Sequence, residues 1–259
     1  MRFTERHNYI LSKFDSSIPV NYLPESNVDI YFYNFNSKNT KSTPDKVGLF
    51  EMRKSVPGAI DDDRINENNI FKYPVFLPRN SIKSNECILL LHGLNERKWN
   101  KYLSWGHTLS EKTGKPVLVF PISFHINRSA PEWLNPRLMS EKIESRYNFY
   151  HTKNELTTFI NYALSDRLTQ LPERFFFSGL QTANDLVSLL TEIKTGQHPL
   201  FEKDTKTDMF AYSIGGLLAQ VMYIANPLNL FGGSKLLLFC AGSVFSEMNG
   251  VSKVIMDKT

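Results

Sequence analysis

Ser213 is the residue whose surroundings in the sequence are best suited to chemistry. It is the centre of residues 211–215, A-Y-S-I-G, which match the nucleophile-elbow pattern G-x-S-x-G with alanine in place of the first glycine. Such a sharp turn from strand to helix strains the backbone of its central residue, so the residues two positions away must be small. It also brings the free N–H groups of the helix N-terminus close to the serine oxygen. The pattern predicts a serine nucleophile, although S-x-G also arises by chance in a chain with 13 glycines.

The elements that must position this serine can be recognised on either side of it. Residues 209–212 form a short apolar strand, and residues 217–225 have the pattern of a helix. Upstream, residues 87–91 (C-I-L-L-L) and 116–121 (P-V-L-V-F-P) have the continuous apolar character of strands that are buried on both faces. A helix pattern at residues 99–112 lies between them. This order of strand, turn, helix and strand predicts a parallel sheet with helices on its faces.

Further strands are expected before and after this core. Residues 28–35 (V-D-I-Y-F-Y-N-F) alternate as a strand does, and residues 73–77, bracketed by two prolines, form a second strand that is expected near an edge. After the elbow helix, residues 235–239 (K-L-L-L-F) predict another buried strand. Residues 1–27 are expected to be an irregular lead-in that packs against the core.

A long connection follows the strand at residues 116–121. Residues 122–178 contain two helical stretches, 139–146 and 153–168, and a further helix is expected at 181–195. A connection of this length usually has structure of its own and often a function. Five of its aromatic side chains are candidates to line an apolar pocket: Phe124, Trp133, Tyr147, Phe149 and Tyr150. Three charged sites are expected at the solvated surface: residues 61–63 (D-D-D), Arg128 and Arg137.

Taken together, these strands and motifs resemble the α/β-hydrolase superfamily. The resemblance depends on I-L-L-L-H-G-L-N at 88–95, P-V-L-V-F-P at 116–121, A-Y-S-I-G-G at 211–216 and K-L-L-L-F at 235–239. It covers the chain from about residue 28 onward and implies a single α/β domain of residues 1–259, with a mostly parallel sheet. Residues 122–178 lie where the superfamily inserts a cap. The last strands of the superfamily have no counterpart, so the sheet is expected to be incomplete at its C-terminal edge.

The resemblance implies hydrolysis of a carboxylic ester or a related small-molecule acyl substrate, without a cofactor or a metal. Ser213 would attack the acyl carbonyl, and two backbone N–H groups would stabilise the oxyanion that forms. One donor would be the N–H of Ile214. The other would be the N–H of Leu94, with Asn95 a close second, in the turn after the third strand. His92 is expected to be structural.

The sequence departs from the superfamily at the general base. A serine hydroxyl needs a base, usually a histidine that a carboxylate holds, and the superfamily's order along the chain is serine, acid, histidine. No histidine follows Ser213 in this sequence, whereas Glu247 lies just after the sixth strand, where some members place the acid. Glu247 is therefore the candidate acid. The six histidines that precede Ser213 are His7, His92, His107, His125, His151 and His198.

Three explanations for the missing histidine remain open. The favoured one is that the 259 residues belong to a longer hydrolase whose further part holds the histidine. The exposed edge strand near residue 239 would agree with this, and it would also permit a homo-oligomer. A second is a site in which the base is His125 or His151, from the long connection before Ser213. The third, which is the alternative function, is a non-catalytic binding or scaffold protein of the same fold.

Composition excludes several classes of protein. The chain has 259 residues and a net charge of +4, and its 30 basic residues form no block, so nucleic-acid binding is not expected. No apolar run is long enough to span a membrane, and the N-terminus has no apolar signal region, so a cytoplasmic location is expected. Cys87 and Cys240 both lie beside apolar runs and are expected to be small buried residues rather than a metal or disulfide pair.

Overall fold

A single seven-stranded sheet forms the centre of the computed structural model, which describes residues 2–38, 62–79, 83–241, 245–247 and 249–257. The strand order is β1-β2-β3-β5-β4-β6-β7. The strands are β1 (Val20–Asn21), β2 (Val28–Asn36), β3 (Ile70–Pro78), β4 (Ser84–Leu91), β5 (Val117–Phe120), β6 (Phe201–Tyr212) and β7 (Leu236–Phe239). Among these, β1 and β3 run against the direction of the others. The mostly parallel sheet, flanked by helices, is consistent with an α/β-hydrolase-like fold.

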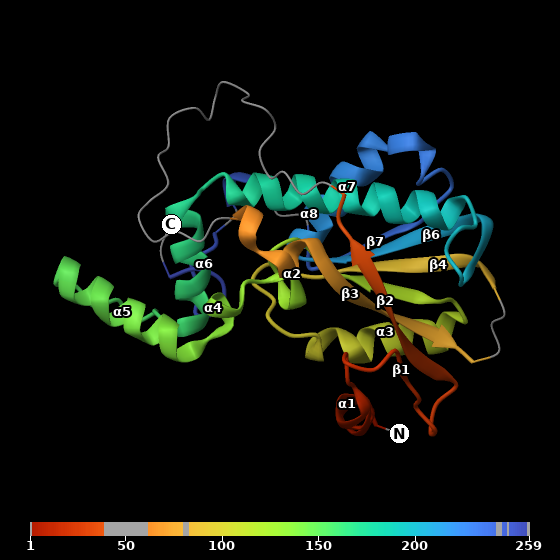
Figure 1. Ribbon diagram of the computed structural model, residues 1–259, viewed down its shortest axis with the longest axis horizontal. Helices are drawn as coiled ribbons and strands as arrows, with labels where there is room; N and C mark the ends of the chain where they lie inside the picture. The colour runs from red at the N-terminus through yellow and green to blue at the C-terminus, as the bar shows by residue number, and fades with distance from the viewer. Residues whose placement is uncertain (1, 39–61, 80–82, 242–244, 248, 258–259) are drawn as a thin grey trace.

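Helices cover both faces of the sheet, as expected. The helices α1 (Phe3–Lys13) and α3 (Asn100–Thr113) lie on one face, and α7 (Arg174–Lys194) and α8 (Ile214–Ala225) lie on the other (Figure 1). Because side chains alternate along a strand, β4 supplies both cores. Its residues Leu89 and Leu91 pack on the side of α7 and α8, whereas Ile88 and Leu90 pack on the side of α1 and α3.

Two predictions about the first third of the chain are wrong. Residues 1–27 are not simply an irregular lead-in, because α1 forms there and buries Ile10 in the core beneath α3. β3 is not at an edge, because it pairs with both β2 and β5. Only Val75 and Phe76 of β3 pair with β5. Pro74, which has no N–H to donate, lies outside this pairing.

The segment after β5 folds into short helices beyond one end of the sheet (Figure 1). It contains the 3-10 turn η2 (Ile126–Arg128) and the helices α4 (Pro131–Leu134), α5 (Pro136–Tyr150) and α6 (Phe159–Gln170). The helix expected at 153–168 begins at 159 instead, since Thr158 caps it by accepting from the Asn161 N–H. The helix expected at 181–195 begins earlier, at Arg174, so residue 178 lies inside α7. Whether residues 122–178 act as a cap stays a prediction.

The last strand lies at an edge with its side chains exposed. The exposed fractions of Leu237, Leu238 and Phe239 are 52%, 40% and 43%, so the prediction of a buried strand is wrong for β7. Within the described residues no strand pairs with its outer side. Pairing through this edge in a homo-oligomer remains a prediction. The remaining short elements are η1 (Asp62–Arg64), α2 (Asn66–Asn69), η3 (Pro227–Asn229) and η4 (Phe245–Glu247).

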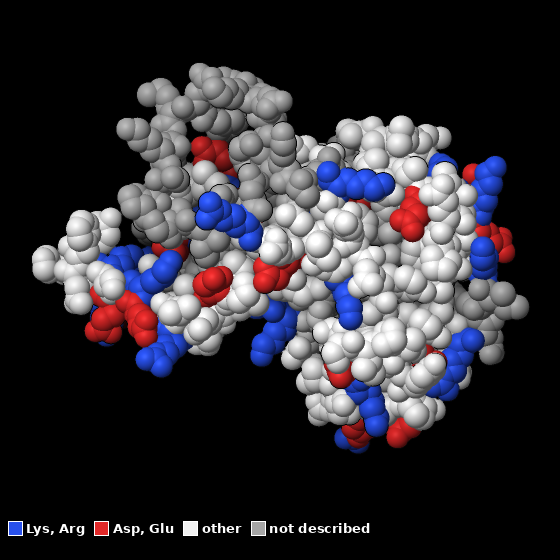
Figure 2. Space-filling model, viewed as in Figure 1, with Lys and Arg blue, Asp and Glu red and all other residues white. Residues whose placement is uncertain are grey.

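Acidic and basic side chains are interspersed over the face of the molecule in Figure 2. In the described ranges, no helix has the length and apolar character needed to cross a bilayer. The same ranges contain no group of three or more His, Cys, Asp or Glu side chains arranged to hold a metal ion. Cys87 is buried as predicted, but Cys240 is exposed, because it follows the edge strand β7.

Candidate active site

Ser213 stands at the turn between β6 and α8, as the sequence predicts. Its backbone has φ 53° and ψ −123°, a conformation that residues with a side chain rarely adopt. Holding a non-glycine residue there costs on the order of 1–3 kcal/mol, and such strain is found most often at functional sites. Residue 213 is partly exposed rather than buried, and it lines a hollow of the surface.

Small residues around the turn are required by close packing. A Cβ atom on Gly215 would lie 2.5 Å from the carbonyl oxygen of His92, and one on Gly216 would lie 2.2 Å from the Cβ of Ala241. Ala211 is fully buried and pairs with Leu91 of β4. The helix α8 can therefore approach the end of β4 because residue 215 is a glycine, and the segment after β7 because residue 216 is one.

The turn after β4 lies directly against the Ser213 turn. A Cβ atom on Gly93 would be 2.9 Å from the ring of Tyr212 and 3.4 Å from the Cβ of Ser213. The backbone N–H groups of the three residues predicted for the oxyanion hole, Leu94, Asn95 and Ile214, make no hydrogen bond to any part of the chain that the structure describes. The structure thus brings together the elements that hold these donors.

Asn95 has a second role that the sequence did not reveal. Its side-chain amide donates to the carbonyl oxygens of Ile160 at 3.1 Å and of Val254 at 2.9 Å. It thereby ties the turn after β4 to α6 and to the segment 249–257, which passes beside Ser213. The backbone of Asn95 is left-handed, with φ 58°, a conformation that asparagine tolerates better than most residues.

No histidine is hydrogen-bonded to the Ser213 hydroxyl, and that hydroxyl has no hydrogen-bond partner in the described ranges. His92 uses both ring nitrogens: Nδ1 contacts the carbonyl oxygen of Gly93, and Nε2 accepts from the N–H of Ile122 at 2.8 Å. Burial lowers its pKa to about 4, so it is neutral and structural. His151 is exposed at the C-terminal end of α5 and makes no contact with the Ser213 turn.

His107 and His125 each have a buried ring nitrogen with no partner in the described chain, and of the two only His125 lines the apolar pocket. The Nδ1–H of His125 donates to the carbonyl oxygen of Ser123 at 2.8 Å, so the neutral ring presents Nε2 as an acceptor. Nε2 is buried and has no partner in the described chain. Burial, followed by the nearby charge of His92, holds the pKa of His125 well below its usual range.

Neither acid that follows Ser213 contacts a histidine. Glu247 is exposed in η4 and accepts a long hydrogen bond from Ser246 at 3.4 Å. Asp257 is buried, where it pairs with Arg146 and accepts from the hydroxyl of Thr157 at 2.7 Å. The acid role of Glu247 stays a prediction, and Asp257 holds the segment 249–257 onto the helices after β5.

Two hollows meet at Leu94, beside the Ser213 turn. The first, here called the charged cleft, has a volume of about 840 Å³ and includes Ser213. Its other lining residues are Gly93, Leu94, Asn95, Glu96, Arg97, Lys98, Asn100, Lys101, Leu134, Pro136, Phe159, Ile160, Tyr212, Val254 and Ile255. Within it, Lys101 pairs with Glu96 and lies 4.4 Å from the centre of the Tyr212 ring.

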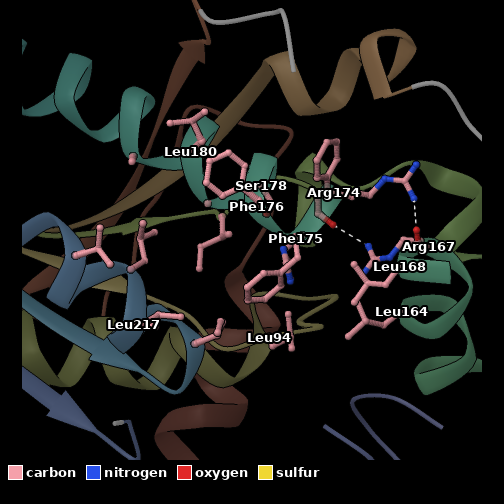
Figure 3. A pocket seen from close by; sticks show the side chains of 18 residues that line it. Leu94, Leu164, Arg167, Leu168, Arg174, Phe175, Phe176, Ser178, Leu180 and Leu217 are labelled. Atoms are coloured by element: carbon pink, nitrogen blue, oxygen red, sulfur yellow. Dashed lines mark hydrogen bonds between the residues drawn. The ribbon is translucent and has the colours of Figure 1, made fainter. Parts of the chain in front are cut away.

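The second hollow, here called the apolar pocket, has a volume of about 350 Å³ and lies between α6, α7 and α8 (Figure 3). Leu94, Ile214 and Leu217 form the part nearest the elbow, and Arg167 and Arg174 lie at another side. Most of the rest of its lining is apolar: Ile122, Phe124, Leu164, Leu168, Phe175, Phe176, Leu180, Ala183, Leu218 and Val221. Both volumes are in the range of small-molecule sites.

Most of the aromatic residues predicted to line an apolar pocket do not line this one, and Tyr147 and Tyr150 line a separate hollow with Arg146 and Asp257. Among them Phe124 lines the apolar pocket, whereas Trp133 is buried in a small core with Ile65, Phe124 and Ala130. Phe149 and Tyr150 are exposed at the end of α5. The aromatic lining comes instead from Phe175 and Phe176 at the start of α7, which the sequence did not identify as helical.

A buried polar layer lies behind the apolar pocket, where solvated charges were expected. Arg128 is fully buried, and its guanidinium donates to the carboxylate of Asp185 at 2.8 Å and to the backbone of Asn68. Burial lowers the pKa of Arg128 to about 10, against the effect of Asp185. Asp62 is also buried and pairs with Arg174, whereas Arg137 is exposed as predicted. Asp61 lies outside the described residues, and the side chain of Asp63 is not described.

With this geometry established, comparison with known proteins places the chain in a family. A family model described as "Family of unknown function (DUF6051)" matches residues 1–259. The chain belongs to this family.

No curated protein matches this DUF6051 member. Among solved structures, a "putative acetyl xylan esterase" from Bacteroides fragilis NCTC 9343 is similar at 12% identity and a TM-score of 0.41, over 85% of this chain. The chain spans 48% of the length of that structure. A likeness this distant supports no conclusion about substrate.

Proposed function

We propose that this protein is a serine hydrolase that cleaves a carboxylic ester or a related acyl compound, with Ser213 as its nucleophile. The observation that carries the proposal is the strained backbone of Ser213, held between β6 and α8 at the lining of the charged cleft. A glycine would fit this conformation without strain, so the presence of a serine there points to a use for its hydroxyl.

The backbone supplies candidate donors for the oxyanion. The N–H of Ile214 is at the first residue of α8, where the positive end of the helix dipole adds to its effect. The N–H of Leu94 is the second donor of the proposal, with Asn95 as the alternative. A donor of this kind typically lowers the barrier by about 3 kcal/mol.

The two halves of the substrate would occupy different hollows, with the scissile ester bond between them at Ser213. We assign the acyl group to the apolar pocket, because the lining of this pocket includes Leu94 and Ile214, whose N–H groups are the proposed oxyanion donors. The leaving group would then occupy the charged cleft, where Ser213 lies with Glu96 and Lys101.

Ser213 needs a general base, and there are two candidates for it. In the described chain His125 has the chemistry of a base, since a carbonyl fixes its Nδ1–H and its Nε2 is free. It also lines the apolar pocket together with Ile214. A base supplied from beyond the 259 residues is the other candidate. Replacement of His125 by alanine separates the two: it abolishes turnover in the first case and changes it little in the second.

Hydrolysis of p-nitrophenyl esters tests the proposal. We expect the Ser213→Ala variant to lose at least about 1000-fold in kcat, because removal of a catalytic serine has effects of this size or larger. Ser145→Ala is a matched control, since Ser145 is exposed on α5 and its hydroxyl bonds only within that helix. Equal activity of wild type and Ser213→Ala would refute the proposal.

A second candidate function is non-catalytic binding by the same fold. The observation that favours it is the absence of a histidine bonded to Ser213 in the described ranges. In this case the wild-type protein has no esterase activity above the Ser213→Ala background but still binds an apolar ligand in its pocket.

A further inference from the structure

Arg167 lines the apolar pocket and forms no ion pair with any carboxylate of the described chain. Arg167, from α6, is buried, with an exposed fraction of 5%. Its Nη1 donates to the carbonyl oxygen of Phe124 at 3.0 Å, and its Nε has no partner. No carboxylate in the described ranges forms an ion pair with it. A buried guanidinium without a counter-charge is costly, so such groups in native proteins usually have a use.

The neighbouring Arg174 differs from Arg167 because it has a carboxylate partner. Arg174 also lines the pocket, but its guanidinium pairs with the carboxylate of Asp62 and donates to the carbonyl oxygen of Arg167 at 2.7 Å (Figure 3). The two guanidinium groups lie 4.8 and 5.1 Å from the ring centre of Trp133, which fixes both of them. One of the two positive charges is therefore neutralised, and the other is not.

The described carboxylates whose charge acts on Arg167, those of Asp62 and Asp166, each form an ion pair with another cation. His125 lines the same pocket and is neutral, because burial lowers its pKa. Burial, together with the positive charges of Arg174 and Arg97, lowers the pKa of Arg167 itself to about 9, which leaves it protonated at neutral pH. Asp166, next to it in sequence, pairs with Lys142 instead.

The rest of the pocket sets the shape of the ligand. Apolar side chains of α7 and α8 connect the elbow end, at Leu94 and Ile214, with the side that contains Arg167 (Figure 3). A volume of about 350 Å³ holds roughly ten groups of the size of a methylene or a water molecule. A chain of this length fits a pocket whose lining includes both Ile214 and Arg167.

We propose that the apolar pocket binds an acyl chain whose far end is a carboxylate, and that Arg167 pairs with that carboxylate. The substrate class is then the half-esters of medium-chain dicarboxylic acids, with the ester at Ser213 and the free acid at Arg167. This inference rests on the proposed function for the position of the ester, but the pairing at Arg167 is a binding property of its own.

Binding to the Ser213→Ala variant tests the pairing without any hydrolysis. Calorimetry compares monomethyl suberate with methyl octanoate, which has an acyl chain of the same length without the terminal acid. We expect the half-ester to bind at least 10-fold more tightly, since a charge-assisted hydrogen bond has an effect of this size. Adding Arg167→Met should remove the preference. Arg137→Met, which loses the same charge at the exposed surface of α5, should keep it.

Two further variants keep the test decisive if Arg167→Met is unstable. Arg167→Lys retains the charge and should keep most of the preference. Gly179→Phe places a ring in the pocket, where a Cβ on Gly179 meets nothing within 4 Å, and should weaken both ligands. Equal binding of the two ligands, no binding of either, or a preference that survives Arg167→Met would overturn the inference. Esterase activity lost in Ser213→Ala while the ligands bind equally would leave the proposed function intact.

Discussion

The charged cleft and the apolar pocket share Leu94 but differ in almost every other respect. The cleft contains Ser213 and several ionic side chains, among them the pair of Lys101 and Glu96. The pocket is narrower, lined by leucines and phenylalanines, and its cations lie on a side away from Leu217. Such a difference on the two sides of one serine is what an ester hydrolase needs, because the two halves of its substrate are chemically distinct.

Both hollows depend on a single rigid junction, the first turn of α8 where it packs against the sheet. Gly215 and Gly216 allow α8 to pack against the ends of β4 and β7, and this packing fixes Ser213 on one side and Ile214 on the other. Side chains in either hollow can therefore change with little effect on the other, whereas a change at the junction should affect both.

The largest expected effect is at this junction. Gly215→Val places a side chain 2.5 Å from the carbonyl oxygen of His92, so α8 must move, and we expect the free energy of unfolding to fall by about 3 kcal/mol or more. Urea unfolding measures it. Gly179→Ala is the control, because it meets open space in the helix α7 and should raise stability by about 0.5–1 kcal/mol. Equal stability of both variants would mean that the junction is not rigid.

The next largest effect is the pH dependence of stability that comes from His92, the buried histidine whose carbonyl oxygen faces Gly215. The pKa of His92 is about 4 in the folded state, below its unfolded value near 6.5, so the unfolded state takes up the proton first as the pH falls. The contribution of neutral His92 to the free energy of unfolding is fully present above pH 6.5. It declines between pH 6.5 and pH 4, and about 2 kcal/mol is lost at pH 5.

Unfolding by urea at pH 7 and pH 5 measures this loss. His198, whose pKa burial also lowers to about 4, should add to it, so His198→Gln should make the pH dependence less steep. Stability that is constant from pH 7 to pH 5 would contradict the neutral, buried state of His92.

A smaller effect separates the two hollows directly. Gly179→Phe should raise the KM of p-nitrophenyl octanoate about 10-fold and leave that of p-nitrophenyl acetate almost unchanged, because the short acyl group does not reach the pocket. Lys101→Ala, in the cleft, should affect the two esters equally. An equal rise for both esters in Gly179→Phe would show that the acyl chain does not enter the apolar pocket.

The smallest effect is the strain at the nucleophile. Ser213→Gly should be more stable than Ser213→Ala by about 1 kcal/mol, since glycine accepts φ 53° and ψ −123° without a Cβ clash. Thermal unfolding of the two variants compares them. If the alanine variant were equally stable, the backbone at residue 213 would not be strained.

The elbow could be predicted from the sequence because its pattern is confined to one short stretch. Small residues stand at positions 211, 215 and 216, with a strand before and a helix after, although the atoms for which they leave room belong to the distant residues 91, 92 and 241. The buried strands were also predictable, since a run such as residues 87–91 is apolar on both faces. The β7 strand has the same composition, but its place at an edge depends on the order of strands, which composition does not encode.

The pocket could not be predicted because its parts are distant in the sequence. Arg128 looks like a surface residue until Asp185, 57 positions away, is folded against it. The lining of the apolar pocket likewise combines α6, α7, α8 and the turn at Leu94. The helix α1 was missed because its residues are mostly polar, and it is anchored chiefly through Ile10.

Covalent labelling at residue 213 is the most direct test of the central claim. The protein is incubated with a fluorophosphonate, which reacts with activated serines, and the modified peptide is identified by mass spectrometry. We predict one adduct per chain, on Ser213, which Ser213→Ala abolishes and Ser145→Ala retains. An unmodified folded protein, or an adduct on another serine, would contradict the assignment of Ser213 as a nucleophile.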